Sequence, residues 1–344
     1  MNADRLAELL AMFPSRRIAV IGDFFLDKYL EVDHALDEPS FETGLNANQV
    51  TAIRRFAGAA GTVVNNLAAL GCRTLHAIGA VGDDGEAFDL QHCLHQVGCS
   101  TDGLVTCGEI MTPTYLKPRD RRDPSLAGEH ERYDTKNRAP MPRSVHDQVL
   151  ATLDRVLPEV EAVIVLDQVV EDDCGVITAA MRTALAERAR RHPNVLFWAD
   201  SRKHIREFRN MLIKPNQFEA VGHANPLPDE RIDLERLKSE LPALRATTQA
   251  PVCVTLGERG LMVSEPVPTF VRAVRVAGPI DPTGAGDSVT AGMVLSLISG
   301  ATMPEAALIG NLVASITVQQ LATTGVARPE ELPARLELWR GQCP

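Results

Sequence analysis

The sequence predicts an α/β fold built on a doubly wound, mostly parallel β-sheet. Short apolar segments alternate with longer segments of helical character, the pattern of βα units around a parallel sheet. The first apolar segment ends in a Gly-Asp turn at 22–23, as expected where a buried strand brings side chains to the edge of such a sheet. Two polar, turn-rich segments, about 28–56 and 108–142, break the alternation and are typical of surface excursions.

The elements follow in order along the chain. The apolar segment 17–23 predicts the first strand, 61–70 predicts a helix of small residues that ends at Gly71, and 75–81 predicts the next strand. Further strands are expected at 162–166, 195–199 and 252–256, and further helices at 178–191, at 234–244 and from the glycine turn near 286 to about 297.

Length alone allows one large α/β domain or two small ones, and the periodic pattern favours a single domain, residues 1–344. Lys and Arg number 35 against 45 Asp and Glu, and the net charge of −10 argues against a nucleic-acid-binding surface. The seven cysteines form no CxxC motif, and neither a signal peptide nor a long apolar span is recognisable. We therefore expect a reduced, cytoplasmic protein without a membrane contact.

Residues 281–287 (DPTGAGD) place two glycines and a carboxylate at the start of an apolar helix. Gly284 and Gly286, on either side of Ala285, let backbone N–H groups approach an anion, and the helix adds its positive N-terminal end. Asp287 would repel a phosphate there, but it can take a proton from an attacking hydroxyl. The segment predicts phosphoryl transfer with Asp287 as base; a glycine-rich helix cap with an acidic first turn is the alternative.

The string 281–287, with its continuation SVTAG at 288–292, resembles the second signature of the ribokinase-like (pfkB) carbohydrate kinases. Pro282 is the one unusual residue. The resemblance extends over 17–331 as an ordered series of motifs. It implies a kinase that uses ATP and Mg²⁺. It also implies that the segments 28–56 and 108–142 form a small β-sheet lid over the sugar. We expect a homodimer formed through this lid.

The N-terminal motif GDFFLD at 22–27 is similar to the family's first sugar-binding segment. The resemblance implies that Asp27, and with it Asp23, accepts hydrogen bonds from substrate hydroxyls. An Asx turn or a helix cap is the alternative for either residue.

Residues 58–71 resemble the family's first signature, in which a Gly-Gly turn and a following Asn contact the sugar. Here Gly58 is followed by Ala59, and Thr62 stands where the Asn is usual. Thr62 is still expected to bind substrate, but its hydroxyl cannot replace the two-ended amide of Asn.

Two motifs resemble the nucleotide side of the family. In KPNQFE at 214–219, the resemblance places Asn216 near the phosphates and has Glu219 orient Mg²⁺ through water, as magnesium prefers. In TLGERG at 255–260, it places Thr255, Gly257 and Gly260 against the nucleotide; a plain hairpin turn is the alternative.

Further site residues are implied nearer the C-terminus. Asn311, expected to head an apolar helix, matches an adenine-side residue. In related kinases the residue that matches Asp281 and the loop that matches 321–325 bind a monovalent cation such as K⁺, so Asp281 joins Glu219 as an expected metal-binding residue.

The segment 117–122 (KPRDRR) concentrates four cations in a lid candidate of an acidic protein. Lys117 and Arg119 are therefore expected to bind a phosphate on the substrate, the alternative being a solvated charged loop. Asp200 and Arg202 follow a predicted strand, and they either touch a substrate or form a surface ion pair.

The branch most resembled is that of the heptose kinases, on the grounds of GDFFLDKY at 22–29 and ERYD at 131–134. We expect ATP-dependent transfer to a hydroxyl of a sugar or sugar phosphate, a heptose 7-phosphate being one candidate. The alternatives are a nucleoside or plain-sugar kinase of the same fold, which stacking aromatics in the lid would favour, and a non-catalytic sugar- or nucleotide-binding regulator, which the altered turn at 58–62 would favour.

Overall fold

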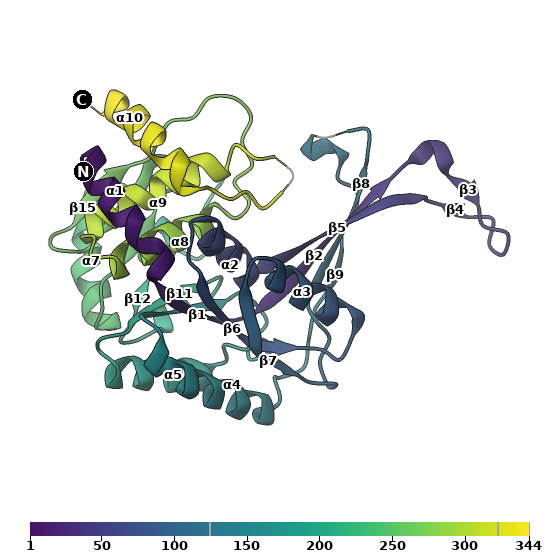
Figure 1. Cartoon of the computed structure of the whole chain (residues 1–344), viewed down its shortest axis with the longest axis horizontal. Coiled ribbons are helices and arrows are strands. Elements are labelled where there is room, and N and C mark those ends of the chain that lie inside the picture. The colour runs from purple at the N-terminus through teal and green to yellow at the C-terminus, as the bar shows by residue number, and fades with distance from the viewer. Residues whose placement is uncertain (124, 322, 344) are drawn as a thin grey trace.

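The main sheet of the protein is parallel and has six strands, in the order β12-β11-β10-β1-β6-β7. The computed structural model describes residues 1–123, 125–321 and 323–343. The chain starts in the middle of the sheet and winds outward in both directions, which confirms the predicted doubly wound sheet (Figure 1). The strands are β1 (Arg17–Gly22), β6 (Thr74–Val81), β7 (Cys99–Thr106), β10 (Ala162–Asp167), β11 (Leu196–Ser201) and β12 (Leu212–Ile213).

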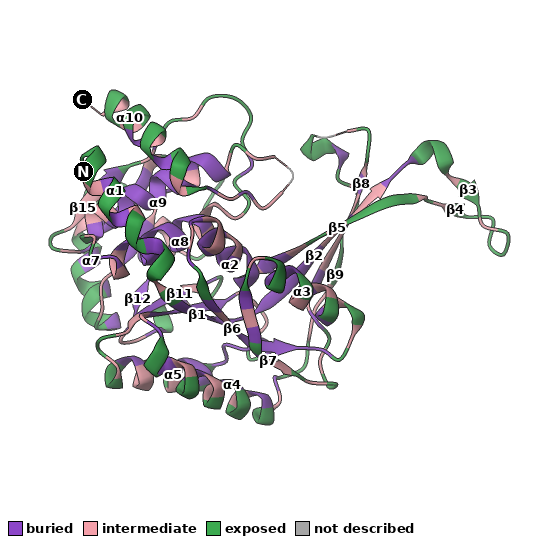
Figure 2. Cartoon of the chain, viewed as in Figure 1, coloured by how far each residue is buried: buried purple, intermediate pink, exposed green. Residues whose placement is uncertain are grey.

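Helices cover both faces of this sheet, because its strands are apolar on both sides. In β1, Ile18 and Val20 belong to one hydrophobic core, and Ala19 and Ile21 belong to the other. Figure 2 shows buried strands in this sheet and exposed outer faces on the helices around it. The first core contains α1 (Ala3–Met12), α2 (Ala60–Ala69), α3 (Gly85–Gln96), α8 (Ala285–Ile298), α9 (Met303–Thr317) and α10 (Leu332–Gln342). The second contains α4 (Arg143–Val156), α5 (Ala179–Arg191), the short α6 (Gln217–Ala220) and α7 (Leu234–Thr248).

A three-stranded antiparallel sheet continues the main sheet beyond β12. It consists of β13 (Cys253–Thr255), β14 (Gly260–Val263) and β15 (Thr269–Arg272). Single parallel bridges, Ile213 to Val252 and Asn216 to Thr255, join it to the end of β12. The chain reverses after β13 because Gly260 has φ +117°, and a Cβ there would collide with the carbonyl oxygen of Val271. The expected strand at 252–256 therefore belongs to a hairpin.

The lid is a four-stranded sheet of order β5-β2-β8-β9, built from two parts of the chain. Its strands are β2 (Phe24–Val32), β5 (Val50–Ala59), β8 (Thr114–Asp120) and β9 (Tyr133–Thr135). A two-stranded extension of β3 (Glu38–Pro39) and β4 (Asn46–Ala47) carries the lid away from the body of the molecule as an arm (Figure 1). The lid sheet takes in more than 28–56, because only Asp23 separates β1 from β2.

Within the described part of the chain, no helix combines the length and apolar character needed to cross a membrane. The seven cysteines are free, and five of them are buried, in agreement with a role as small core residues.

Candidate functional site

The turn before α8 forms the centre of the candidate site. Gly284 is the N-cap of α8 and has φ +76°, a conformation that favours glycine. The N–H of Ala285 donates to the carbonyl oxygen of Pro282 at 3.1 Å. The N–H groups of Gly286 and Asp287 belong to the first turn of the helix, where they have no intrahelical acceptor. They can receive an anion at the positive end of the helix.

Asp287 lies half-buried in this first turn. Burial raises the pKa of its carboxyl group to about 7, and the nearby carboxylate of Asp200 raises it as well, while Lys214 and Arg202 lower it. A carboxyl group that titrates near neutral pH is suited to general-base catalysis.

A cavity of about 730 Å³ opens beside this turn. Ala285 and Gly286 line it on one side, so the anion-receiving amides border the cavity. The volume falls in the range of cofactor and ligand pockets. The expected nucleotide residues that line the same cavity are Thr255, Gly257, Gly260 and Asn311.

Asn311 lies in the middle of α9 and does not head a helix, which corrects the sequence-based expectation. The helix begins at Met303 and is capped by Thr302, which forms a capping box with Glu305. The amide nitrogen of Asn311 donates to the carbonyl oxygens of Val271 and Arg272, both at 3.1 Å. Both N–H bonds of the amide are used in this way, so its oxygen is what the side chain offers to the cavity.

Asn216 and Glu219 form a capping box around α6. Asn216 Oδ1 accepts from the backbone N–H of Phe218 and Glu219, and Glu219 Oε2 accepts from the N–H of Asn216 at 2.7 Å. The bridge from Asn216 to Thr255 places this box next to the strand that leads to the cavity. Burial raises the pKa of Glu219.

The donor set fits magnesium held largely by water and phosphate. Among the residues that the structure describes, no three His, Cys, Asp or Glu side chains come together as a metal cage. Mg²⁺ needs no such cage, because it keeps several waters and takes one or two carboxylates together with substrate phosphates. Glu219, whose Oε1 is not used by the capping box, can supply such a carboxylate.

A second group of expected site residues lies on the lid sheet. Asp27 on β2 forms an ion pair with Lys117 on β8, with 2.9 Å between Oδ1 and Nζ. The Lys117 ammonium also donates to the hydroxyl of Tyr29 at 3.2 Å and lies 4.8 Å from the centre of its ring. Asp27 is close enough to Asp287 to raise its pKa, so this face of the lid is directed toward the catalytic turn. The structure thus brings Asp27, Gly58 and Lys117 together.

Thr62 lies against the turn before α8. It is buried in the first turn of α2, and its Cγ2 would be 3.3 Å from a Cβ placed on Gly284. Ala59, the N-cap of the same helix, has φ +51° and ψ −118°, a backbone conformation that glycine adopts more easily. The residue that replaces the second glycine of the signature is therefore strained.

The contacts of Asp23 correct the expectation that it binds sugar hydroxyls. Its Oδ1 accepts from the N–H of Val176 at 2.7 Å, and its Oδ2 accepts from Gln168 at 2.8 Å and Val169 at 3.3 Å. The side chain is buried, and burial raises the pKa of Asp23 to about 7. Asp23 therefore anchors the loop after β10. The sequence did not show this role, because the loop is distant along the chain.

Arg119 also has a different role from the expected one. Its side chain is buried, and its guanidinium donates to the carbonyl oxygens of Asp123 at 2.8 Å and Ser125 at 3.1 Å. It holds the loop that follows β8, so these N–H groups are not free for a substrate phosphate.

Asp281 ties the start of the catalytic turn to the end of α9. Its Oδ1 accepts from the N–H of Thr283 at 3.0 Å, and its own N–H donates to the carbonyl oxygen of Val318 at 2.8 Å. Within the expected cation-binding loop 321–325, residue 322 lies outside the described residues.

Sequence reasoning missed the partner of Asp200. The Nζ of Lys214, directly after β12, lies 2.8 Å from Asp200 Oδ2. Arg202 donates from Nε to Gln168 Oε1 at 3.0 Å. The signal for Lys214 was its place in the first position of KPNQFE, at the end of a strand.

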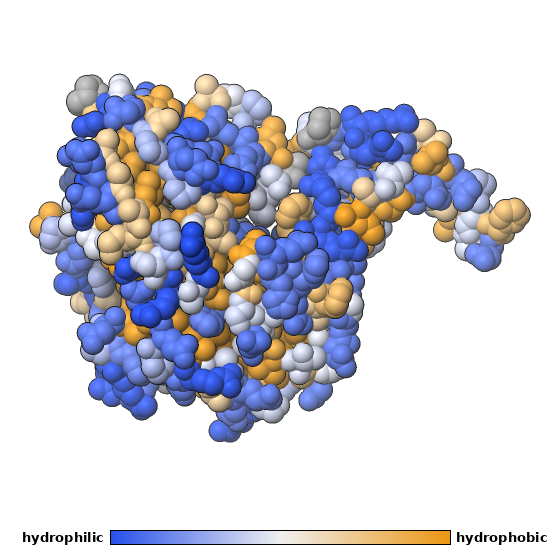
Figure 3. Space-filling view, viewed as in Figure 1, coloured by the Kyte–Doolittle hydropathy of each residue, from blue (hydrophilic) through white to orange (hydrophobic). Residues whose placement is uncertain are grey.

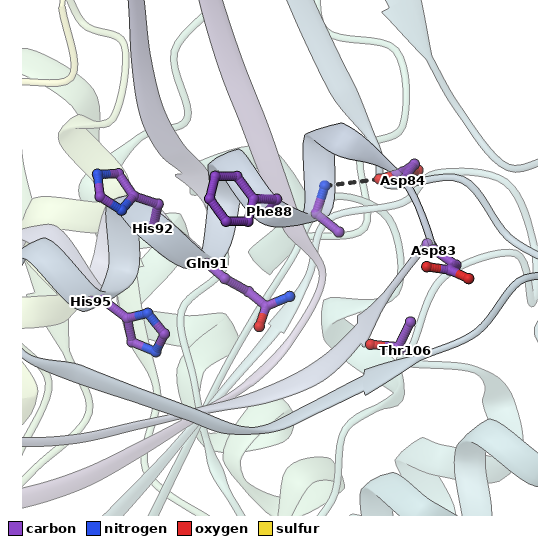
Figure 4. A pocket seen from close by; sticks show the side chains of 9 residues that line it. Asp83, Asp84, Phe88, Gln91, His92, His95 and Thr106 are labelled. Carbon is purple, nitrogen blue, oxygen red and sulfur yellow. Dashed lines mark hydrogen bonds between the residues drawn. The ribbon is translucent and has the colours of Figure 1, made fainter.

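A second cavity, of about 320 Å³, lies beside α3 at the β7 edge of the main sheet (Figure 4). Figure 4 shows Phe88, Gln91, His92 and His95 along the helix, with Asp84 capping its start. None of the expected site residues lines this cavity.

Comparisons with known proteins show the family and the fold of this chain. A family model described as "pfkB family carbohydrate kinase" matches residues 16–330. The bifunctional protein HldE of a Nitratiruptor species is 28% identical over 328 residues, which cover 92% of this chain and 64% of that protein. HldE of Desulfatibacillum aliphaticivorans is 27% identical over 332 residues, covering 95% of this chain and again 64% of the relative. The chain thus spans less than two thirds of these relatives.

Two solved structures share the fold. The ribokinase of Thermotoga maritima superimposes with a TM-score of 0.65 at 19% identity, covering 94% of this chain and 99% of that one. The ribokinase of Arabidopsis thaliana, solved in complex with ribose and ATP, has a TM-score of 0.64 at 16% identity, with coverage of 94% and 99%.

Proposed function

This chain belongs to the pfkB family of carbohydrate kinases, and we propose that it transfers the γ-phosphoryl group of ATP to a hydroxyl of a phosphorylated sugar, a heptose 7-phosphate being the first candidate. One observation carries the proposal. Asp287 stands at the N-terminus of α8, directly after Gly286, which lines the 730 Å³ cavity, and Asp27 on the lid is near enough to raise the pKa of Asp287. A nucleotide on one side and an acceptor hydroxyl on the other would meet at this carboxylate.

In the proposed reaction Asp287 takes the proton of the acceptor hydroxyl. The hydroxyl oxygen forms a bond to the γ-phosphorus as the bond to the β–γ bridging oxygen breaks, and ADP leaves with that electron pair. The N–H groups of Gly286 and Asp287, together with the positive end of α8, stabilise the negative charge on the phosphate oxygens. Glu219 would hold Mg²⁺ through water, and the bound ion would supply positive charge that neutralises part of the charge on the phosphates.

The lid supports a sugar rather than a nucleoside as acceptor. A nucleoside acceptor would need free aromatic rings on which its nucleobase could stack, but cations already cover two rings of the lid. Lys117 lies over Tyr29 at 4.8 Å, and Arg132 lies over Tyr115 at 4.4 Å. On the lid face of Asp27, β5 adds Arg54, 4.8 Å from the Tyr29 ring. Arg119 is held by its own loop, and Arg54 is bonded to Glu31 at 2.8 Å. Lys117 is therefore the cation that we propose for the phosphate of the acceptor.

An acceptor screen tests the proposal. We would measure ADP release with heptose 7-phosphate, its unphosphorylated parent, ribose, fructose and nucleosides, with Asp287→Asn as the blank. A kcat/KM for the sugar phosphate at least about tenfold above that of its parent, the effect of one charge-assisted hydrogen bond, supports the proposal. Equal kcat/KM values for the sugar phosphate and its parent would contradict the proposal and indicate a plain-sugar kinase. Activity on nucleosides alone would indicate a nucleoside kinase. Binding of sugar or ATP without any turnover would indicate a regulator.

We further propose a homodimer formed through the lid. The arm exposes apolar side chains, among them Phe41, Leu45, Val50 and Ile53, and Figure 3 shows hydrophobic residues along it. Apolar surface of this kind marks interaction sites. Light scattering of the purified protein should give twice the chain mass, and Ile53→Glu should return it to the monomer. A monomeric wild type at micromolar concentration contradicts this proposal.

A monovalent cation at Asp281 and the loop 321–325 is the last part of the proposal. Replacing K⁺ by tetramethylammonium at constant ionic strength should then lower kcat. An unchanged kcat would contradict a functional monovalent cation at this position.

A further inference from the structure

A buried ion pair lies beside the turn 281–287, and the phosphoryl transfer proposed above does not use it. Lys214 Nζ and Asp200 Oδ2 are 2.8 Å apart, and their side chains are only 6% and 13% exposed. Taking two charges out of water is costly, and such pairs often contribute little net stability. Their retention in this site therefore points to a role beyond holding the fold.

The position of the ammonium group connects it to the reaction centre. Lys214 Nζ would be 3.3 Å from a Cβ placed on Gly286, so the missing side chain at Gly286 leaves room for this cation next to the turn. The adjacent residue in sequence is Asp287. Gly286 thus serves two purposes: its N–H faces the anion site, and its lack of a Cβ admits Lys214.

The charges around Asp287 come from three further elements. Asp200 and Arg202 lie at the end of β11, Lys214 follows β12, and Asp27 lies on β2. Asp200 and Asp27 disfavour an ionised Asp287, whereas Lys214 and Arg202 favour it. Of the two cations, Lys214 is buried and fixed by Asp200, and Arg202 is exposed and bonded to Gln168.

We propose that Lys214 is a positioning residue of the phosphoryl-transfer centre: held by Asp200, its fixed ammonium keeps Asp287 ionised and ready to take a proton next to the phosphates. This inference rests on the proposed function. Without Lys214, an ionised Asp287 would face the carboxylates of Asp200 and Asp27 and the phosphates, with the exposed Arg202 as the remaining favourable charge. The base would then hold its proton at the pH at which it is needed.

Titration of Asp287 by ¹³C NMR of protein labelled at aspartate carboxyl carbons tests this without any turnover, with Asp287→Asn identifying its signal. Lys214→Met should move the midpoint upward by about one pH unit, the low end of the shift that a close charge produces. Lys214→Arg should keep the midpoint near that of the wild type. Asp200→Asn should lower it, and the double variant Lys214→Met/Asp200→Asn should lie between the single variants. The acid limb of kcat/KM with a verified acceptor should move in parallel.

The matched control is Lys203→Met. Lys203 also follows β11 and forms an ion pair, with Asp172 at 2.7 Å, but it is exposed and is not among the charges that shift the pKa of Asp287. The substitution Lys203→Met should leave the titration midpoint of Asp287 unchanged. Folding is checked by thermal unfolding, and if Lys214→Met does not fold, Asp200→Asn and the double variant decide. Unchanged midpoints in the folded variants, or an equal shift in the control, overturn the inference. Absence of ADP release with every acceptor would refute the proposed function instead and leave the NMR result to stand alone.

Discussion

The carboxylate of Asp27 occupies the space that a side chain at position 58 would need. A Cβ on Gly58 would lie 2.5 Å from Asp27 Oδ2, on the neighbouring strand of the lid. A side chain at position 58 would force Asp27 Oδ2 to move, and Oδ1 of the same carboxylate forms the ion pair with Lys117. Glycine at position 58 therefore lets Asp27 keep its present position.

Gly58→Ala should displace Asp27 and raise KM for the sugar acceptor roughly tenfold, the loss expected for one charge-assisted hydrogen bond. KM for ATP should stay near its wild-type value. Steady-state kinetics with each substrate varied in turn measure both constants. Gly108→Ala is the matched control, because a Cβ at Gly108 meets nothing within 4 Å. A proportional rise in both KM values would separate Asp27 from the acceptor site.

Ala59→Gly should stabilise the protein. Ala59 has φ +51°, and release of backbone strain of about 1–3 kcal/mol outweighs the extra chain entropy of glycine, about 0.5–1 kcal/mol. We expect a net gain of about 1 kcal/mol in the free energy of unfolding, measured by urea titration. Ala57→Gly, in the same strand and fully buried, should destabilise and serves as the control. Destabilisation by both variants would contradict strain at Ala59.

Asp287→Asn should lower kcat by about 10²- to 10⁴-fold and leave ATP affinity nearly unchanged, because the amide keeps the shape but cannot take the proton. In the wild type, log kcat/KM should rise with pH and level off above about 7, where Asp287 is ionised. Isothermal titration with ATP and a pH-rate profile provide the two measurements. A variant that retains most of its kcat would refute the assignment of the base.

The same substitution should affect stability in a pH-dependent way. The folded protein keeps a proton on Asp287 up to about pH 7, whereas the unfolded chain loses it near pH 4, so folding is penalised as pH rises through this window. Asp287→Asn removes the penalty and should raise Tm relative to the wild type at about pH 8. At about pH 4 the difference should largely disappear. Thermal unfolding at both pH values checks this, and a lower Tm of the variant under the alkaline condition would contradict it.

Asn311 should make the enzyme prefer ATP to GTP. Its amide oxygen, fixed by the two bonds of the amide nitrogen, can accept from the amino group of adenine but not from the carbonyl of guanine. Asn311→Leu should reduce the ratio of kcat/KM for ATP and GTP about tenfold. Ser315→Ala, which also lines the cavity, is the control. An unchanged ratio in Asn311→Leu would exclude the residue from base recognition.

The regular part of the fold was predictable from the sequence because its signal is local. Apolar segments such as 17–23 and 162–166 are buried on both faces, and their alternation with helices leaves few arrangements other than a doubly wound sheet. The reversal of the chain after β13 was only the alternative interpretation of 255–260, and the periodic pattern did not predict it. It depends on the turn at Gly257–Arg259 and on a contact between Gly260 and Val271 that periodicity does not encode.

Site prediction was limited by contacts between distant segments. The glycine turn before Asp287 carries its chemistry within seven residues, so its anion-binding geometry could be inferred. By contrast, two hydrogen bonds to distant parts of the chain become visible only in the folded structure. Asp23 accepts from the backbone N–H of Val176, and Arg119 donates to a carbonyl oxygen of its loop. A charged residue in a motif shows that a partner is needed, but not whether that partner is a ligand or the protein itself.

The way in which the lid is assembled has a consequence for folding. β2 and β5 form an antiparallel pair from neighbouring segments, but the other edge of β2 pairs with β8, more than eighty residues later in the chain. Until β8 is made, the edge of β2 remains open to any other strand. A ribosome-bound chain that has passed β5 but not β8 should therefore be the form most prone to aggregate, with its exposed edge next to the apolar arm.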